Sequence, residues 1–292
     1  MLRASTVGEL AFRILARGRK GEVTRVFPRS VNIRAGSDFL VLLWGDLRSP
    51  LTVNLVGEAG AASFAPESTC EITNRVIHAG GTNVDVEGAE IYHSSLRRSR
   101  ILRLPAGSEL ASSVAMLRSL YDVSPGGPGL PADSAFREFV GNVLVPFAAG
   151  RRKVVYDLGL YQELVGRGTG FTPAGDDFLG GFAAAYRLMA RSYGWKNISF
   201  RRNWLSSKTI PESAAILSCA ARGYVDELME RLIIRSMGRE GPFHRELLAV
   251  ARRGHTSGMD MSLGVLLCEA ALNGQTDGGD ALRLCLESLG EP

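Results

Sequence analysis

Two glycine-rich segments carry the side chains whose types and spacing are best suited to chemistry. The first, residues 166–177, reads Gly-Arg-Gly-Thr-Gly-Phe-Thr-Pro-Ala-Gly-Asp-Asp. Glycines allow positive φ angles and a close approach of a ligand to the backbone. A glycine-rich loop that runs into a helix start presents free N–H groups and the positive end of the helix dipole, which together bind anions. This segment therefore predicts an anion site.

Asp176 and Asp177 would lie in the first turn of that helix, with Thr172 at its N-cap and Pro173 at its first position. Consecutive helical residues point roughly 100° apart, so one carboxylate can face a ligand while the other braces the loop. The alternative is an ordinary tight turn whose acidic residues favour the helix dipole. The segment is not a Walker A loop, since no Gly-Lys-Ser/Thr follows, nor a Rossmann fingerprint, since no strand leads into Gly168.

The second segment, residues 254–260, reads Gly-His-Thr-Ser-Gly-Met-Asp. Gly254 would end one helix, and Ser257 with Asp260 resembles a capping box that begins the next. His255 can act as an acid or base or can orient an oxygen anion. Alternatively, it bonds the carbonyl groups of the helix that ends there. Ser257 lacks a Gly-x-Ser-x-Gly setting, so we do not expect it to be a nucleophile.

These segments define the candidate site. We expect Asp176, Asp177 and His255 to be catalytic. We expect the other polar and glycine residues to bind the substrate: Gly168, Thr169, Gly170, Thr172, Gly175, Thr256, Ser257 and Asp260. The polar residues of 209–213, which open another helix, could line the same cleft, although capping explains them equally well. The hypothesis requires both turns to face a common pocket rich in unpaired amide hydrogens.

The first hundred residues predict strands after one opening helix. Thr6 and Glu9 suggest a capping box, apolar residues then follow at helical spacing, and Gly18 ends the helix. Short β-branched or apolar runs come next, at residues 23–27, 31–33, 39–44, 52–56, 72–77, 84–86 and 101–104. Closely spaced strands without helices between them favour an antiparallel sheet or barrel.

From Ser108 onward the apolar residues take a helical period. We expect helices near residues 110–121, 136–147, 176–192, 211–222, 224–237, 242–253 and 258–273. Pro146 should kink or end the second of these. The predicted fold class is α+β. A β-rich domain with the opening helix would span residues 1–105, and an all-helical domain with both glycine-rich segments would span residues 106–292.

Composition narrows the function classes. Lys and Arg number 34 and Asp and Glu number 30, so the net charge is +4, and the arginines form small clusters rather than a basic stripe. This argues against nucleic-acid binding, although one cluster could recognise an anionic substrate. The four cysteines show neither metal-like spacing nor a disulfide framework. The longest apolar run, residues 39–44, is too short to span a bilayer. We expect a cytoplasmic protein without a signal peptide that binds neither nucleic acid nor membrane.

The two segments resemble a bacterial family, long classed as a domain of unknown function, that includes the AllH-type subunit of oxamate carbamoyltransferase. The family pattern Gly-x-Gly-Leu-Thr-Pro-Ser-Gly-Asp-Asp corresponds to residues 168–177, and Gly-His-Ser-Ser-Gly-x-Asp corresponds to residues 254–260. The run Phe-Pro-Arg-Ser-Val-Asn at residues 27–32 and the helix at 209–223 also fit. The departures are conservative: Phe171 stands for leucine, and Ala174 and Thr256 stand for serine.

The resemblance implies a subunit of a carbamoyltransferase that works with two other subunit types. It would transfer a carbamoyl group between oxalurate and phosphate, giving oxamate and carbamoyl phosphate, in purine or allantoin catabolism. The loop at 168–175 would bind the anion through its N–H groups. Asp176 or Asp177 would hold an amide N–H or a divalent ion such as Mg²⁺, and His255 would move or stabilise a proton.

The Ser-Thr-Arg-Thr loop by which aspartate and ornithine carbamoyltransferases hold carbamoyl phosphate is absent from this sequence. Carbamoyl chemistry would therefore use another fold or be completed by partner subunits. Two alternatives stay open. One is a non-catalytic binding or scaffold subunit of a multi-subunit enzyme. The other is a metal-dependent hydrolase that uses the Asp pair and His255, with oxygen ligands suited to Mg²⁺ or Mn²⁺.

Overall fold

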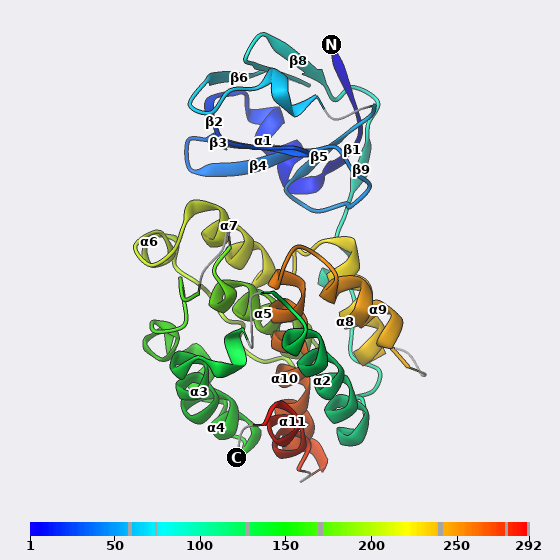
Figure 1. Cartoon of the computed structure of the whole chain (residues 1–292), viewed down its shortest axis with the longest axis vertical. Helices are drawn as coiled ribbons and strands as arrows, with labels where there is room; N and C mark the ends of the chain where they lie inside the picture. Colours follow the sequence, from blue (N-terminus) through cyan, green and yellow to red (C-terminus); the bar gives the residue numbers. More distant parts are fainter. Residues whose placement is uncertain are drawn as a thin grey trace. The chain divides into compact units, whose positions relative to one another are not determined.

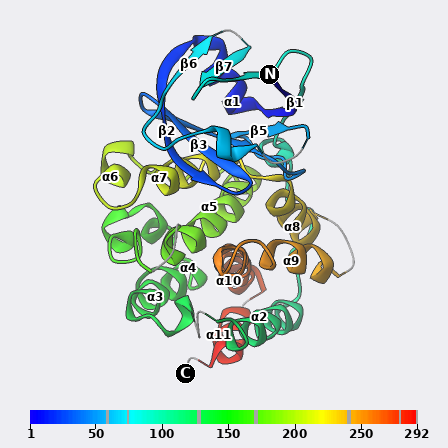
Figure 2. The ribbon, with the colours of Figure 1, turned by 45° about the horizontal axis from the view of Figure 1, so that its top comes forward.

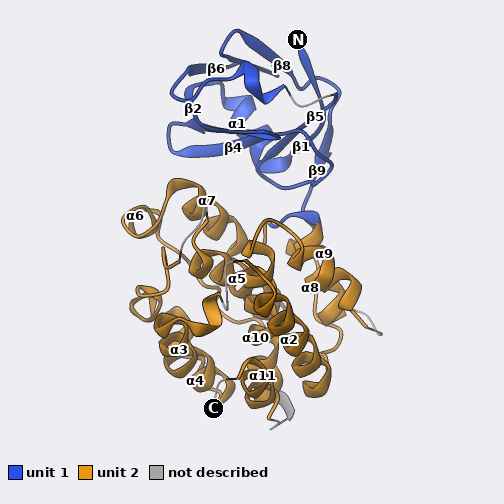
Figure 3. Ribbon diagram, viewed as in Figure 1, with its two compact units in different colours: residues 1–94, 225–227 blue, residues 95–224, 228–292 orange. Residues whose placement is uncertain are grey.

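The chain consists of two compact units (Figure 3). The computed structural model describes residues 1–57, 60–73, 75–125, 129–168, 172–238, 242–277 and 280–290. Unit 1 comprises Met1–Ser94 with Val225–Glu227, and unit 2 comprises Ser95–Tyr224 with Leu228–Pro292. Unit 1 is β-rich and unit 2 is helical. The predicted α+β class is therefore confirmed.

Unit 1 is a closed barrel of mixed strands with one further strand (Figure 1). Its strands are β1 (Leu2–Gly8), β2 (Arg19–Phe27), β3 (Ser30–Ala35), β4 (Asp38–Leu43), β5 (Thr52–Leu55), β6 (Thr69–Thr73), β7 (Val76–Ala79), β8 (Thr82–Asp85) and β9 (Glu90–Tyr92). They follow the order β5-β4-β3-β2-β6-β7-β8-β1, the pairing of β1 with β5 closes the ring, and β9 lies beside β1. The pairs β1–β8, β1–β9 and β4–β5 are parallel, so the barrel is not purely antiparallel.

The barrel is filled by apolar side chains that alternate with outward-facing ones along the strands. Its core includes Val23, Ile33, Leu40, Leu42 and Val53, all fully buried. Helix α1 (Glu9–Arg17) adds the buried residues Ala11, Ile14 and Leu15 to the same core. The predicted opening helix and its end at Gly18, where φ is 53°, are both present.

Three local predictions for the first 105 residues are wrong. Thr6 does not cap α1, because it belongs to β1 and pairs with strands on both sides. Residues 72–77 do not form one strand: they contain the end of β6 and the start of β7, with Arg75 at a φ of 71°. Residues 101–104 form no strand.

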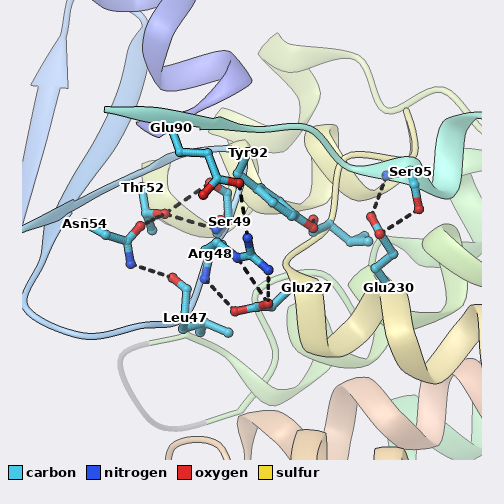
Figure 4. A network of polar contacts seen from close by, with 11 residues as sticks. Leu47, Arg48, Ser49, Thr52, Asn54, Glu90, Tyr92, Ser95, Glu227 and Glu230 are labelled. Atoms are coloured by element: carbon cyan, nitrogen blue, oxygen red, sulfur yellow. Dashed lines mark hydrogen bonds and ion pairs between the residues drawn. The ribbon is translucent and has the colours of Figure 1, made fainter. Parts of the chain in front are cut away.

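The segment Val225–Glu227 belongs to unit 1 through polar contacts (Figure 4). The Tyr92 hydroxyl donates to the carbonyl oxygen of Val225 at 3.1 Å. The Arg48 guanidinium donates to one carboxylate oxygen of Glu227 from Nε at 3.2 Å and from Nη2 at 3.0 Å. The Arg48 backbone N–H donates to the other oxygen at 3.1 Å. These contacts hold a piece of the later sequence against the barrel.

Unit 2 is built from helices. They are α2 (Gly107–Asp122), α3 (Ser134–Phe139), α4 (Val145–Ala148), α5 (Ala174–Tyr193), α6 (Arg202–Ser206), α7 (Pro211–Ala220), α8 (Glu227–Gly238), α9 (His244–Ala251), α10 (Ser257–Asp277) and α11 (Ala281–Leu289). The predicted helix at 136–147 is interrupted by a π-helical turn, Val140–Leu144, before Pro146. Pro146 has no N–H to donate to the carbonyl group four residues earlier, and its ring clashes with that group. The wider turn before it avoids this clash.

Helices α5 and α10 lie side by side at the centre of unit 2 (Figures 1 and 2). Glycines allow this contact. A Cβ at Gly181 would overlap the carbonyl oxygen of Met261, and a Cβ at Gly264 would overlap that of Phe178. The apolar face predicted for α5, including Phe178, Phe182 and Tyr186, is fully buried. The close contact sets the register of the two helices, and so places the first turn of α5 beside the first turn of α10.

Candidate functional site at the start of the two central helices

The two glycine-rich segments meet. The Thr172 hydroxyl donates to Asp177 Oδ2 at 2.7 Å and lies 3.0 Å from the Ser257 hydroxyl. Thr172 does not cap α5 as predicted, because Pro173 occupies the N-cap position and the helix begins at Ala174. Ser257 is the first residue of α10. Both hydroxyls are half-buried and therefore form a polar rim above the deeper carboxylates.

Glycines are required at the backbone positions that form this junction. A Cβ at Gly175 would overlap the carbonyl oxygen of Leu164, and one at Gly258 would overlap that of Val250. A Cβ at Gly166, where φ is 78°, would likewise overlap the carbonyl oxygen of Lys208. Gly168 has a φ of 108°, a conformation that favours glycine. The glycine pattern in the sequence is thus explained by close backbone contacts as well as by conformational freedom.

Asp176 braces the loop. Its Oδ1 accepts the Gly166 N–H at 2.8 Å, and its other oxygen accepts the Thr209 hydroxyl. Burial raises the pKa of Asp176, while hydrogen bonds from Thr209 and Gly166 act in the opposite direction. Asp176 as a whole is only 2% exposed. Of the polar residues at 209–213, Thr209 therefore contacts Asp176.

Asp177 points to the other side, toward the rim. Burial raises its pKa to about 6, whereas hydrogen bonds from Thr172 and Ser257 lower it; the charge of Asp176 raises it and that of Arg253 lowers it. The two adjacent carboxylates thus have different surroundings, as the roughly 100° between consecutive helical residues requires. One is held by the loop, and the other is directed toward α10.

Asp260, on α10, is fully buried and interacts with Asp177. Burial raises the pKa of Asp260 to about 7; hydrogen bonds with Tyr121 and Thr256 lower it, and the charge of Asp177 raises it. The Tyr121 hydroxyl donates to Asp260 Oδ1 at 2.8 Å. Two carboxylates with pKa values near neutrality are suited to general acid–base work, because both protonation states are populated at working pH.

Tyr121 is the residue that sequence reasoning missed. It ends the apolar stripe of α2, where it reads as one more core residue. A buried tyrosine hydroxyl nearly always needs a polar partner, so its place in an apolar stripe was a signal that a polar group lay nearby. The sequence gives no indication that this group is Asp260, 139 residues later.

His255 is exposed, and within the described residues it makes no hydrogen bond or ion pair. Thr256 interacts with Asp260. Thr169 and Gly170, which we expect to bind substrate, lie outside the described residues, as does Phe171. The structure thus brings together Thr172, Asp177, Ser257 and Asp260, and places Asp176 behind them.

A shallow pocket lies on the Asp176 side. Its volume is about 290 Å³, and it is lined by Gly166, Pro173, Ser206, Ser207, Lys208, Thr209 and Ile210. The Thr209 hydroxyl that binds Asp176 comes from this wall. Lys208 is exposed and has no carboxylate partner among the residues that the structure describes. The pocket therefore combines a cation with the loop that the sequence predicts to bind an anion.

Comparison with known families covers this region of the chain. Residues 164–269 match the family of the oxamate carbamoyltransferase subunit AllH. The resemblance inferred from the two glycine-rich segments is confirmed for this stretch. No curated protein and no solved structure matches the chain.

The AllH match contains both glycine-rich segments, the Asp pair and Asp260, and it ends at Glu269 within α10. Tyr121 lies before it. The matched stretch is therefore the part of unit 2 that runs from the loop before α5 to the middle of α10.

None of the helices in the described ranges is long and apolar enough to cross a membrane.

The AllH-matched site does not have the donor set of a metal centre. Within the described ranges, no group of three or more His, Cys, Asp or Glu side chains is arranged to hold a metal ion. Both oxygens of Asp176 already accept hydrogen bonds. The residues present therefore do not fit the divalent ion considered from the sequence.

Proposed function

We propose that this chain is a subunit of a carbamoyltransferase that acts on a small anion, with oxalurate and phosphate on one side of the reaction and oxamate and carbamoyl phosphate on the other. One observation carries the proposal: the contact of Thr172 with Ser257 joins two helix starts directly above Asp177 and Asp260. Helix starts favour anions, and the carboxylates supply proton transfer. The family match supports this class of reaction.

In the forward direction, a phosphate oxygen attacks the ureido carbonyl carbon of oxalurate, and the bond from that carbon to the oxamate nitrogen breaks. One proton must leave hydrogen phosphate, and one must reach the departing nitrogen. Asp177, with a pKa of about 6, is suited to accept the first. Asp260, with a pKa of about 7 and a hydrogen bond from Tyr121, is suited to supply the second. The hydroxyls of Thr172 and Ser257 would relay these protons from the rim.

The helix starts would bind the charged groups. Positive dipole ends and free N–H groups stabilise oxygen anions where charge develops. Lys208, beside the loop, would add a cation for the substrate carboxylate. Holding phosphate and oxalurate together would supply a large part of the rate by orientation alone. His255, exposed on the second turn, would act at the edge of this site.

A second candidate is a binding or scaffold subunit that contributes one wall of a shared site. The deep burial of Asp177 and Asp260, at 2% and 0% exposure, favours it. In this case a partner subunit would provide the reacting groups, and Thr172 and Ser257 would orient the substrate. Either function would be expected in the cytoplasm, in purine or allantoin breakdown, with other subunits as partners. No observation favours a metal-dependent hydrolase.

The test is reconstitution with the partner subunits, followed by measurement of carbamoyl phosphate formed from oxalurate and phosphate. Asp177→Asn should lower the rate by about 100-fold or more, the usual effect of removing a general acid or base. Asp122→Asn, at an exposed position on α2, is the matched control and should leave the rate unchanged.

The outcomes separate the two candidates. A complex that turns over normally with Asp177→Asn would support the scaffold function and contradict the catalytic role. Absence of both turnover and assembly with any partner would contradict the carbamoyltransferase assignment as a whole.

A further inference from the structure

Three arginines from separate stretches of the sequence lie around one turn of unit 2, and a fourth lies beside one of them on the same helix. We call them the arginine surface: Arg97, Arg187, Arg191 and Arg222. The guanidinium carbon of Arg97 lies 4.4 Å from the centre of the Tyr224 ring, and that of Arg222 lies 5.4 Å from it. A Cβ at Gly223 would lie 3.1 Å from Cγ of Arg97 and 3.2 Å from Cγ of Arg187. The turn at residues 223–224 is therefore enclosed by arginine side chains.

The charges in this surface repel one another. Burial lowers the pKa of Arg187, and the charges of Arg191 and Arg97 lower it further. Arg187 and Arg191 stand four residues apart on α5, a spacing at which like charges destabilise a helix. Arg187 Nε is buried and has no hydrogen-bond partner among the described residues. This arrangement costs stability.

Carboxylates do not offset that cost at three of the four positions. In the described part of the chain, Arg187, Arg191 and Arg222 form no ion pair with Asp or Glu. Other arginines on the protein do: the half-buried Arg103 pairs with Glu109, and the exposed Arg167 pairs with Asp133. Arg222 is instead fixed through Nε to the Ser218 carbonyl oxygen at 2.9 Å. Arg187, Arg191 and Arg222 thus bring three positive charges to this region without an ion-paired carboxylate, which suits the binding of a multiply charged oxyanion.

We propose that the arginine surface is a second anion site, which binds a dianionic phosphate group. The planar guanidinium fork pairs with two phosphate oxygens at once. The Tyr224 ring beneath Arg97 and Arg222 would keep both groups in place, because arginine stacks on aromatic faces. Arg187 stands ten residues after Asp177 on α5, or about 15 Å along the helix axis. The surface is therefore separate from the candidate catalytic site and does not depend on the proposed reaction.

The experiment is isothermal titration calorimetry of the full chain with inorganic phosphate and with pyrophosphate, at low ionic strength. The test variant is R187Q/R191Q, which keeps the side-chain lengths similar and removes two charges. The matched control is R151Q/K153Q, which removes two charges from exposed positions elsewhere on unit 2. Removal of two charge-assisted partners should weaken binding by about tenfold or more. The control should bind as the wild type does, and Asp177→Asn should keep the binding that R187Q/R191Q weakens.

Several results would overturn the proposal. These are no binding of phosphate or pyrophosphate by the wild type, equal weakening by the test and control variants, or binding lost with Asp177→Asn but kept with R187Q/R191Q. The last result would assign the bound phosphate to the catalytic site. Circular dichroism spectra of the variants establish that they are folded, and R191Q alone, at an exposed position, provides a milder test with the same expected direction.

Discussion

Carboxylates that are partly or fully buried have different surroundings in the two units. In the barrel unit, Glu227 receives three hydrogen bonds from Arg48, two from its guanidinium and one from its backbone (Figure 4). The hydrogen bond and the charge of Glu227 raise the pKa of Arg48 in return. Nearby, the buried Asn54 side chain donates to the carbonyl oxygens of Gly45 and Leu47. The side chains of Glu227 and Asn54 are thus hydrogen-bonded and hold the structure.

In the helical unit, Asp177, Asp260 and Glu269 are buried without an ion pair to any described residue. One oxygen of Glu269 accepts the Ser236 hydroxyl at 2.6 Å, and the other has no hydrogen-bond partner among these residues. Burial raises the pKa of Glu269 to about 8. A chain retains such groups at a cost in stability, and strongly shifted carboxylates are most frequent at functional sites. This difference supports the proposal that the chemistry takes place in the helical unit.

The largest effect should come from the contact that positions the site. Gly181→Ala would drive a Cβ into the Met261 carbonyl and separate α5 from α10. We expect the free energy of unfolding to fall by about 3 kcal/mol, at the upper end for overpacking. Urea denaturation measures it. The neighbouring Gly180→Ala meets no atom within 4 Å and should be neutral or stabilise the helix by up to about 1 kcal/mol. Equal effects at both positions would contradict the close contact.

The next effect is on the pH dependence of stability. Asp177 and Asp260 hold protons in the folded protein up to about pH 6 and 7, whereas the unfolded chain loses them near their usual value of 3.8. Their contribution is thus complete below pH 4 and is lost as the pH rises to 7. One pKa unit corresponds to about 1.4 kcal/mol, so each of the two carboxylates should lower stability by about 2–3 kcal/mol between pH 4.5 and 7.5.

Thermal denaturation across that range measures the fall, and D177N/D260N should reduce it. Both substitutions keep the shape of the side chain, but the asparagine side chains cannot ionise. Carboxylates with lowered pKa values, Asp133 and Asp280, change stability only at lower pH and do not obscure the result. A stability that rises with pH in the wild type would show that these two carboxylates ionise freely in the folded protein.

A third prediction separates the two neighbouring aspartates. Asp176→Ala removes the acceptor of the Gly166 N–H and of the Thr209 hydroxyl. Loss of two hydrogen bonds with buried partners should cost about 2 kcal/mol. Asp177→Asn should cost less at pH 7.5, because it removes a charge that burial disfavours. Thr209→Val, which removes one donor only, serves as an intermediate control. The same loss from D176A and D177N would contradict the division into a bracing and a functional carboxylate.

The sequence predicts those parts of the fold that depend on local patterns. Glycine spacing and apolar periodicity gave the start of α5 within two residues and the end of α1 at Gly18. The closely spaced strands in the sequence predicted either a sheet or a barrel, and the structure contains a barrel. Closure could not be predicted, because β1 pairs with β5 and β9 from distant parts of the chain. The spacing of Thr6 and Glu9 is typical of a capping box, and pairing to two strands overrides it.

The same limit applies to the candidate site. Residue types indicated Asp177 and Asp260, since carboxylates after glycine-rich turns are visible in the sequence. The contact between Thr172 and Ser257 joins residues 85 apart, and it arises from the glycine contacts between α5 and α10 rather than from either motif. The partners of each aspartate depend on which way it points, and neighbouring sequence letters carry no information about that direction.

The smallest effect should come from the barrel carboxylate. Arg48→Ala leaves Glu227 without its cation, but the Arg48 side chain is 35% exposed and Glu227 is 13% exposed, so solvent screens the pair. We expect a loss of about 1 kcal/mol. In a double-mutant cycle with Glu227→Gln, the coupling energy should account for most of this loss, since the two side chains contact each other directly.

Glu269→Gln provides the opposite case, because it removes a buried charge and leaves no cation without its partner. It should be neutral or stabilising at pH 8. A costly Glu269→Gln together with a harmless Arg48→Ala would reverse the assignment, making the unpaired carboxylate the structural one.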